Sequence, residues 1–371
     1  MAETVAAVRV APEETEIRTL PVPEIPTDAG LLKVEAAGIC GSDVGIYRRD
    51  NGPAILGHEN VGIVAQIGRV AAERWGVKEG DRVAIEEYLP CGHCNWCHQG
   101  EYRHCRATDN SADPSALRYG STPTTVAPGL WGGYSQYLYL PPQTVIHKVP
   151  DTAPPDELAL ALPLGNGVQW ACVEGGAAPG RSILVMGPGQ QGLGCVIAAK
   201  AAGANPVIIS GLGRDARRLE VAKQLGADVA IDVEHEDLKA NILDATGGEG
   251  VDAVVNTTSA GSGQLIHDAL AVLKRKAGIL VWQGLPAKVE DFPLGVLTRK
   301  YVTLKSCRGH SYMSVELALR YIGSRRFPLE LMCTHRFGLQ DVDTAIRSVG
   351  GKGLDGVIHA TVDPWLEGAA R

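Results

Sequence analysis

The sequence contains no uninterrupted apolar run of membrane-spanning length, and its first ten residues carry a glutamate and no long apolar core. A membrane-spanning helix needs about 20 mostly apolar residues, and a secretory signal needs an apolar core behind a basic start, so we expect neither. The chain also has no basic excess, because its formal net charge at pH 7 is −7. Nucleic acids and anionic membranes attract basic surfaces, and we therefore expect neither as a partner.

Disulfides are not expected, although the chain has nine cysteines. The number is odd, and four of the nine stand in a Cys-x2-Cys-x2-Cys-x7-Cys loop, at Cys91, Cys94, Cys97 and Cys105. Such crowding points to metal ligation in a reducing cytoplasm. Four thiolates leave no open position on a tetrahedral ion, so we predict a structural zinc in a lobe of about residues 88–108. The alternatives are four unrelated buried cysteines or a nucleic-acid-binding zinc knuckle, for which the loop lacks a dense basic patch.

The chain of 371 residues exceeds the usual size of one domain. Its first third consists largely of short β-branched runs separated by turn residues, which predicts a β-rich region. From Pro155 onward strand-like runs alternate with helical patterns, which predicts right-handed crossovers and a parallel sheet. The first of these helices is expected over residues 156–173, interrupted at Pro163, and a closing strand over residues 356–360. We therefore expect an α/β protein in which an inner parallel-sheet unit is bracketed by two pieces of one outer domain.

A glycine-rich turn stands between a strand and a helix of the inner unit. An apolar run of buried-strand character ends at Met186, and Leu193, Val196 and Ile197 then recur at helical spacing. The turn between them reads Gly187-Pro188-Gly189-Gln190-Gln191-Gly192. In this context the glycines allow a sharp turn, close approach of a pyrophosphate and tight packing of helix on strand. The free N–H groups at the helix start would hold phosphates, so the turn predicts a dinucleotide site.

The end of the next strand indicates which nicotinamide nucleotide is bound. NAD-binding folds place an acidic residue there, about 20 residues after the first glycine, to hold the ribose hydroxyls. Here the strand ends at Ser210 and Gly211 without an acid, and arginines follow at positions 214, 217 and 218. An arginine can clamp a 2′-phosphate, so Ser210, Gly211 and Arg214 favour NADP. NAD is the alternative, with Asp215 reaching back to the ribose.

Two glycine-marked segments of the first third each carry a possible metal ligand. Cys40 is followed by Ser42 and Asp43, and His58 is followed by Glu59. A thiolate and an imidazole from separate segments suit zinc. Taken alone, a buried cysteine and a hydrogen-bonded core histidine would explain the same residues.

Four motifs in this order resemble those of the zinc-containing alcohol dehydrogenases in the medium-chain dehydrogenase/reductase superfamily. They are Gly-Ile-Cys-Gly-Ser-Asp at 38–43, Gly-His-Glu-x-x-Gly at 57–62, the four-cysteine loop and the later glycine turn. The similarity runs nearly from end to end. It implies a GroES-like catalytic domain over residues 1–151 and 306–371, and a doubly wound (Rossmann) cofactor domain over residues 152–305. The implied activity is NAD(P)-dependent hydride transfer between an alcohol and a ketone or aldehyde, in a homodimer or homotetramer joined near residues 302–305.

The resemblance also assigns roles to the residues of the first third. Cys40 and His58 would be ligands of a catalytic zinc, Ser42 would pass the alcohol proton, and Asp43 would orient the site. An open position on such an ion polarises a carbonyl or acidifies an alcohol.

The sequence departs from the family pattern at the third zinc ligand, where Leu162 stands in place of Cys, Asp or Glu. Either Glu59 becomes the third ligand, water or Asn166 fills the gap, or the site holds no metal. The histidine that ends the proton relay in some relatives is replaced by Gly45, so Ser42 would pass its proton to a ribose hydroxyl or to water.

Because Leu162 cannot bind a metal, two other functions are also consistent with the sequence. One is a metal-independent NADPH reductase of an activated C=C bond, with Ser42 or Tyr47 giving the proton, and the other is a non-catalytic nucleotide-binding scaffold. Tyr47, Trp131 and Leu162 suggest an apolar pocket wall, although packing explains each of them equally well. No motif supplies an obvious clamp for a phosphate or carboxylate substrate.

Overall fold

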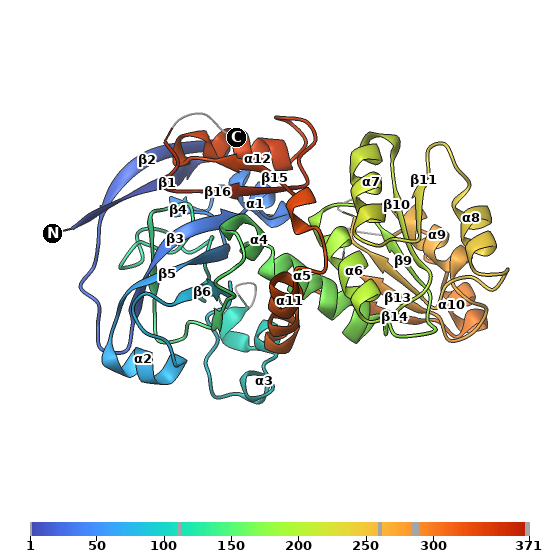
Figure 1. Cartoon of the computed structure of the whole chain (residues 1–371), viewed down its shortest axis with the longest axis horizontal. Coiled ribbons are helices and arrows are strands. Elements are labelled where there is room, and N and C mark those ends of the chain that lie inside the picture. Colours follow the sequence, from blue (N-terminus) through green and yellow to red (C-terminus); the bar gives the residue numbers. More distant parts are fainter. Residues whose placement is uncertain (1, 110–112, 114, 259–261, 284–288, 368–371) are drawn as a thin grey trace. The chain divides into compact units, whose positions relative to one another are not determined.

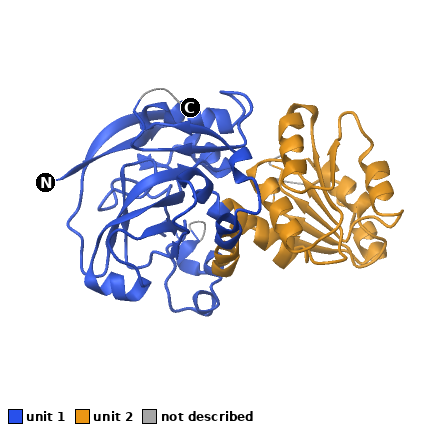
Figure 2. Cartoon of the chain, viewed as in Figure 1, with its two compact units in different colours: residues 1–162, 319–371 blue, residues 163–318 orange. Residues whose placement is uncertain are grey.

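The structure is a computed structural model that describes residues 2–109, 113, 115–258, 262–283 and 289–367. The chain forms two compact units, of which unit 1 holds residues 1–162 and 319–371 and unit 2 holds residues 163–318 (Figure 2). The expected α/β class, with one β-rich unit and one parallel-sheet unit, is confirmed. The domain limits at residues 151 and 306 stay predictions.

A seven-stranded sheet lies at the centre of unit 1 (Figure 1), with the order β15-β16-β3-β5-β6-β8 and with β7 also paired to β3. Its strands are β3 (Gly30–Gly38), β5 (Glu59–Ile67), β6 (Arg82–Ile85), β7 (Tyr137–Leu140), β8 (Ile146–Lys148), β15 (Cys333–Phe337) and β16 (His359–Val362). All pairs are antiparallel except β15 with β16. Because β16 comes from the C-terminal piece and pairs with β3, the two pieces of unit 1 share one sheet, as expected for one outer domain.

A second, three-stranded antiparallel sheet covers part of unit 1, in the order β2 (Glu14–Pro21), β1 (Glu3–Ala11) and β4 (Ala54–Ile55). The buried aliphatic and aromatic side chains of both sheets form one apolar core. The helices that lie wholly in unit 1 are α1 (Gly41–Tyr47), α2 (Arg69–Trp75), α3 (Asn95–His98), α4 (Pro155–Leu158) and α12 (Val342–Val349). The limits between the units fall inside α5 (Ala161–Gly167) and α11 (Tyr312–Ser324).

Unit 2 is a doubly wound parallel sheet. Its strands are β9 (Ile183–Met186), β10 (Val207–Gly211), β11 (Val229–Asp232), β12 (Ala253–Asn256), β13 (Ile279–Trp282) and β14 (Thr303–Ser306). Their order, β11-β10-β9-β12-β13-β14, is that of a Rossmann fold. The helices are α6 (Gln190–Ala201), α7 (Ala216–Gln224), α8 (Leu238–Ala245), α9 (Gln264–Val272) and α10 (Leu294–Lys300). The chain reverses direction across the sheet between β9 and β12, which is where such folds bind ligands.

The predicted helix over residues 156–173 is wrong in its continuity. It is three pieces, α4, α5 and a π-helical segment at Val168–Glu174, and the first break falls at residues 159–160 rather than at Pro163. Pro163 lies in the first turn of α5, where its missing N–H costs no helical hydrogen bond. The closing strand lies at 359–362 instead of 356–360. None of the helices in the described part of the chain is both long and apolar enough to cross a membrane.

Candidate functional site

The first ligand segment is held by the N-terminus of α1. Cys40 is the residue before the helix, and its backbone N–H donates to Asp43 Oδ2 at 2.9 Å. Asp43 is fully buried. Its carboxylate also accepts from His58 Nδ1 at 3.1 Å and from the Tyr134 hydroxyl at 3.3 Å. One carboxylate therefore fixes both the helix start that carries Cys40 and the ring of His58, and it leaves His58 Nε2 as the ring nitrogen available to a metal.

The second ligand segment is placed by the pairing of β5 with β3. Glu59 begins β5 and stands opposite Gly38, the last residue of β3. A Cβ at Gly38 would lie 2.5 Å from Glu59 Oε2, so the carboxylate occupies space that only a glycine leaves. Gly57, just before His58, has φ +88° and packs against the ring of Tyr134. Local packing thus explains why a glycine stands at position 38 in the first motif and at position 57 in the second.

Cys40, His58 and Glu59 converge, with one ligand atom of each lying within 4.8 Å of the others. Ser42 Oγ lies 3.4 Å from His58 Nε2. Thiolate, imidazole and carboxylate together are a donor set that suits zinc, and three protein ligands leave a position for a further ligand. The three residues present therefore have the donor atoms that the predicted catalytic metal would need, and Glu59 is the acidic member of the group.

The pKa shifts of Cys40, His58 and Glu59 are also consistent with a metal site. Burial raises the pKa of Glu59 to about 8, and burial followed by the charge of Glu59 raises the pKa of Cys40. For His58, burial lowers the pKa, but the charge of Asp43 and the hydrogen bond to it raise it well above its usual value. Anionic ligands that are costly to desolvate are stabilised by a divalent cation, which supplies the missing positive charge.

Sequence reasoning missed one acidic residue at this site. Glu87 Oε2 lies 3.7 Å from His58 Nε2, and Glu87 Oε1 pairs with Arg118 at 2.7 Å. Glu87 is the second residue after β6. Its neighbour Glu86 follows the strand directly, and the carboxylate of Glu86 instead contacts His147 in the core at 3.0 Å. Neighbouring residues of an extended chain point to opposite sides, and the sequence does not tell which of two adjacent glutamates faces the site.

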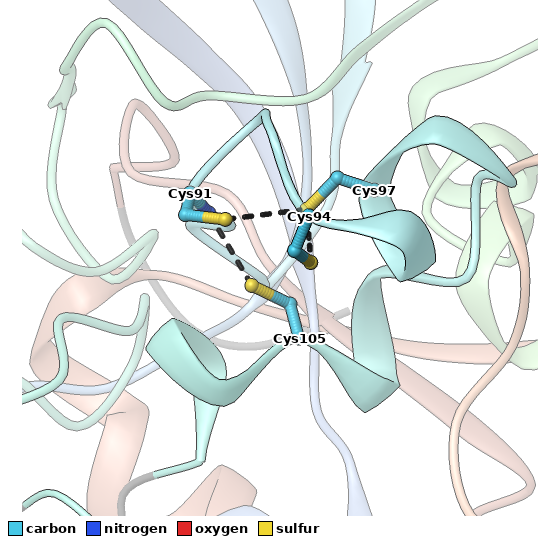
Figure 3. Close-up of side chains that lie close together, drawn as sticks. All are labelled: Cys91, Cys94, Cys97 and Cys105. Atoms are coloured by element: carbon cyan, nitrogen blue, oxygen red, sulfur yellow. Dashed lines mark hydrogen bonds between the residues drawn. The ribbon is translucent and has the colours of Figure 1, made fainter.

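The four cysteines of the predicted zinc lobe also converge (Figure 3), with their sulfur atoms within 4.8 Å of one another. The sulfurs of Cys94 and Cys97 are 3.5 Å apart, and those of Cys91 and Cys97 are 3.8 Å apart. Tetrahedral Zn–S bonds of about 2.3 Å place sulfurs about 3.8 Å from each other. The thiols differ strongly, because a backbone hydrogen bond from His93 lowers the pKa of Cys91 to about 6 while burial raises that of Cys97 to about 12. The four residues fit a closed zinc site.

A cavity of about 590 Å³ lies at the carboxyl end of the unit 2 sheet. Five of the predicted cofactor residues line it: Gly187, Gly189, Ser210, Gly211 and Arg214. The other three, Gln190, Gln191 and Gly192, do not. Gln191 accepts a hydrogen bond from Asn166 at 3.1 Å, and Gly192 lets α6 pack against the turn, because a Cβ there would lie 1.9 Å from the carbonyl oxygen of Gly187.

Residues that the sequence reasoning did not single out complete the cavity. Thr257 and Thr258 line it directly after β12, and Thr257 Oγ1 donates to the carbonyls of Met186 and Gly187 at 2.9 Å. They stand where the strand order reverses, and this topological rule could have found them.

The residues that bear on the choice of nucleotide lie at one end of the cavity. Asp215 accepts from the Leu212 backbone N–H at 3.1 Å and from Arg218 at 2.9 Å, so both of its oxygens already have partners within the turn. Arg214 lines the cavity and is exposed, whereas Arg217 is exposed and does not line it.

Two residues considered for the pocket wall belong to the core of unit 1. Tyr47 and Trp131 are 1% and 2% exposed, and their polar atoms donate to the carbonyls of Glu13 and Val126. This arrangement contradicts Tyr47 as a proton donor, because its hydroxyl hydrogen is already used. Leu162 is buried as well. Asn166 contacts Gln191 and His310 through its two polar atoms.

Comparisons with known proteins agree with this geometry. The chain matches the family models of the alcohol dehydrogenase GroES-like domain over residues 27–151 and of the zinc-binding dehydrogenase over residues 192–323. It is 37% identical over 368 residues to "Probable alcohol dehydrogenase adh" of Mycobacterium tuberculosis, covering 97% of this chain and 98% of that protein. It is 36% identical over 300 residues to a sorbitol dehydrogenase of Bacillus subtilis, covering 78% and 77%.

Solved structures show the same fold. An oxidoreductase/dehydrogenase of unknown specificity from Escherichia coli aligns with a TM-score of 0.83 and 28% identity over 98% of this chain and 99% of that one. A Sinorhizobium meliloti structure determined with bound NADP aligns with a TM-score of 0.82 and 24% identity over 98% and 100%. The chain therefore belongs to the zinc-containing alcohol dehydrogenases of the medium-chain dehydrogenase/reductase superfamily, and it is an enzyme of alcohol oxidoreduction with a nicotinamide nucleotide.

Proposed function

We propose that this enzyme interconverts a secondary or primary alcohol and the matching carbonyl compound at a zinc ion held by Cys40, His58 and Glu59. The observation that carries the proposal is the convergence of these three ligand atoms within 4.8 Å, next to Ser42 and Asp43. A zinc ion at such a site, when bound, supplies the Lewis acidity that makes an alcohol hydroxyl easier to deprotonate.

The protein residues perform the proton and positioning work. Oxidation removes a hydride from the alcohol carbon, to the oxidised nicotinamide, and a proton from the alcohol oxygen. Ser42 Oγ, 3.4 Å from His58 Nε2, would accept that proton while its own hydroxyl proton passes to a ribose hydroxyl or to water. Asp43 keeps the His58 ring oriented throughout, because its carboxylate is itself held by the backbone of Cys40 and by Tyr134.

The nucleotide that we propose is NADP. The carboxylate that NAD-binding folds use for the ribose is missing at Gly211, and both oxygens of Asp215, in the turn that follows, have partners. Arg214 lines the cavity beside Gly211 and has the donors that a 2′-phosphate requires. The other residues proposed to contact the nucleotide are Gly187, Gly189 and Ser210.

The second zinc that we propose is structural and is bound by Cys91, Cys94, Cys97 and Cys105. Four sulfurs at tetrahedral spacing close the coordination shell, so this ion would stabilise the lobe without touching a substrate.

Alcohol-dependent reduction of NADP and of NAD, followed in parallel on the zinc-loaded protein, tests the proposal. We expect turnover with both a secondary alcohol and its ketone partner, with the higher kcat/KM for NADP. Turnover of an activated C=C bond that survives removal of the Cys40 ligand would instead support the metal-independent reductase. The cluster of three ligands argues against that reductase, since hydride transfer to such a bond does not use them.

A further inference from the structure

The lining of the cofactor cavity in unit 2 includes residues other than those assigned to the phosphates and the ribose. These further residues come from the segment after β11 and from the start of α9, and they include Val233, Leu238, Gln264, Leu265 and Asp268. In a Rossmann fold the glycine turn holds the pyrophosphate, and the end of the second strand holds the ribose of the adenosine half. The adenine base is the remaining part of that half, so it is the part that these residues would contact.

Three of these side chains are apolar. Val233, Leu238 and Leu265 line the cavity, and the two leucines also pack against the apolar core of unit 2. Aliphatic side chains that are held in place in this way suit the flat faces of a heteroaromatic base, because stacking on them removes apolar surface from water. Such contacts do not distinguish one purine from another. The few polar groups beside them decide which base is accepted.

Two polar side chains of α9 lie one helical turn apart and both line the cavity. Gln264 is the first residue of the helix and Asp268 comes four residues later, so the two are neighbours on the same face. The Gln264 side-chain Nε2 donates to Asp268 Oδ1 at 2.8 Å. The backbone N–H of Gln264 donates to Ser262 Oγ at 3.3 Å, and the buried Ile266 and Leu270 anchor the helix in the core. The pair therefore stands on a fixed element.

The carboxylate of Asp268 determines which way the Gln264 amide is turned. A carboxylate only accepts hydrogen bonds, so it can bind the NH₂ end of the amide and not the oxygen end. This leaves the amide oxygen as an acceptor and the second N–H of Nε2 as a donor. A side chain whose donor and acceptor are fixed in advance is suited to read the edge of a ligand.

One acceptor beside one donor matches one edge of adenine. The 6-amino group of adenine donates and N7 accepts, and a glutamine or asparagine amide can bind both at once. We propose that Gln264, oriented by Asp268, selects the adenine base of the nucleotide by accepting from the 6-amino group and donating to N7. This inference rests on the proposed nucleotide binding and deepens it, because it adds selection of the base to the proposed selection of the 2′-phosphate by Arg214.

Hypoxanthine is the base that tests this selection. It keeps N7 but carries an oxygen in place of the 6-amino group, so two hydrogen-bond acceptors would face each other at Gln264. Gln264 is exposed in the protein without nucleotide, and water therefore competes for both contacts. We expect the hypoxanthine nucleotide to bind about 5-fold to 10-fold more weakly, which is the low end for recognition of a base by two hydrogen bonds.

The test compares NADPH with reduced nicotinamide hypoxanthine dinucleotide phosphate, its hypoxanthine analogue, by fluorescence titration of the full-length protein. The wild type should give the lower Kd for NADPH. Gln264→Ala should bring the two Kd values to within about twofold of each other, mainly by weakening NADPH, because the contacts to the 6-amino group and N7 are lost together. Asp268→Asn should also lower the ratio of the two Kd values, because an asparagine amide both donates and accepts and would no longer fix the orientation of Gln264.

Gln224 in α7 supplies the matched control. Its Nε2 donates to Glu220 Oε1 at 3.2 Å, which is the same pairing of a glutamine with an acid one turn away, and neither residue is among the described residues that line the cavity. Gln224→Ala should keep the wild-type ratio. Equal Kd values in the wild type, or an unchanged ratio in Gln264→Ala, would overturn the inference and leave the proposed alcohol oxidation intact. A wild type that binds neither nucleotide would remove the proposed function and the inference with it.

Discussion

At the scale of single residues, the site combines predictable and unpredictable members. Cys40, His58 and Glu59 stand in two glycine-containing motifs that resemble those of the family, so their convergence could be expected from the sequence. That Glu59 reaches the cluster depends on Gly38, whose missing side chain leaves room for the carboxylate. Glu87 and Arg118 carry no motif. Their ion pair lies next to an isolated β-bridge between Tyr88 and Arg118, which only the folded chain reveals.

Ser42 is expected to act on the proton and not on the metal. Ser42→Ala should lower kcat by about 10²-fold to 10⁴-fold, the range of a lost proton-transfer group, and leave the zinc content unchanged. Ser324→Ala, at an exposed serine that hydrogen-bonds the nearby backbone of Tyr321 and Arg326, is the matched control and should keep full kcat. Zinc loss in Ser42→Ala, or unchanged kcat, would contradict the role.

Arg214 is expected to set the preference between the two nucleotides. Arg214→Ala should raise the Kd of NADPH about tenfold and change that of NADH little, because only NADPH has the 2′-phosphate. Titration by nucleotide fluorescence gives both constants. Arg217→Ala, at an exposed arginine outside the cavity, should change neither. Equal weakening of both nucleotides would indicate that Arg214 acts on a part that they share.

At the scale of elements, periodicity located the strands well and the breaks in helices poorly. β9 and β10 are apolar runs buried on both faces, so their sequence marks them clearly. The region from residue 156 to 174 is buried almost throughout, and the break between α4 and α5 falls at Ala159 and Leu160, which are not typical turn residues. No local sequence signal therefore marks where α4 ends and α5 begins.

The start of α6 depends on close packing at Gly192. Gly192→Ala would place a Cβ 1.9 Å from the carbonyl oxygen of Gly187, so the turn must shift. We expect a loss of about 1–3 kcal/mol in the free energy of unfolding together with weaker nucleotide binding. Gly189→Ala adds a Cβ with no heavy atom within 4 Å and has ordinary φ, so its unfolding free energy should stay close to that of the wild type. Denaturant unfolding of the two variants compares them, and equal stabilities would contradict the packing account.

The zinc lobe is expected to depend on its metal. Few regular elements hold residues 91–108 apart from α3 and two short 3₁₀ turns, so ligand bonds supply much of the local stability. Cys105→Ser should remove one zinc per chain and expose the lobe to limited proteolysis. Cys172→Ser, at a cysteine outside both clusters, should do neither. A lobe that resists proteases without its zinc would show that packing alone maintains it.

At the scale of the whole molecule, the free edge of the unit 2 sheet is the place where we expect a second copy. Within the described strands β14 pairs only with β13. Leu304 in β14 is 41% exposed, and Tyr301, two residues before the strand, is 68% exposed. Sedimentation equilibrium should give a dimer or tetramer for the wild type, and Leu304→Lys should shift it toward the monomer. Glu249→Lys, at an exposed residue between α8 and β12, is the charge control. A monomeric wild type would contradict the assembly.

The zinc content of the purified protein tests the central claim most directly. Two clusters of ligands predict two zinc ions per chain in the wild type and one in Cys40→Ser, with the remaining ion held by the four-cysteine lobe. Two ions in the wild type, one in the variant and loss of alcohol oxidation in the variant would support the account. A wild type that oxidises alcohols with a single zinc ion, and that keeps both the ion and the activity in Cys40→Ser, would contradict it.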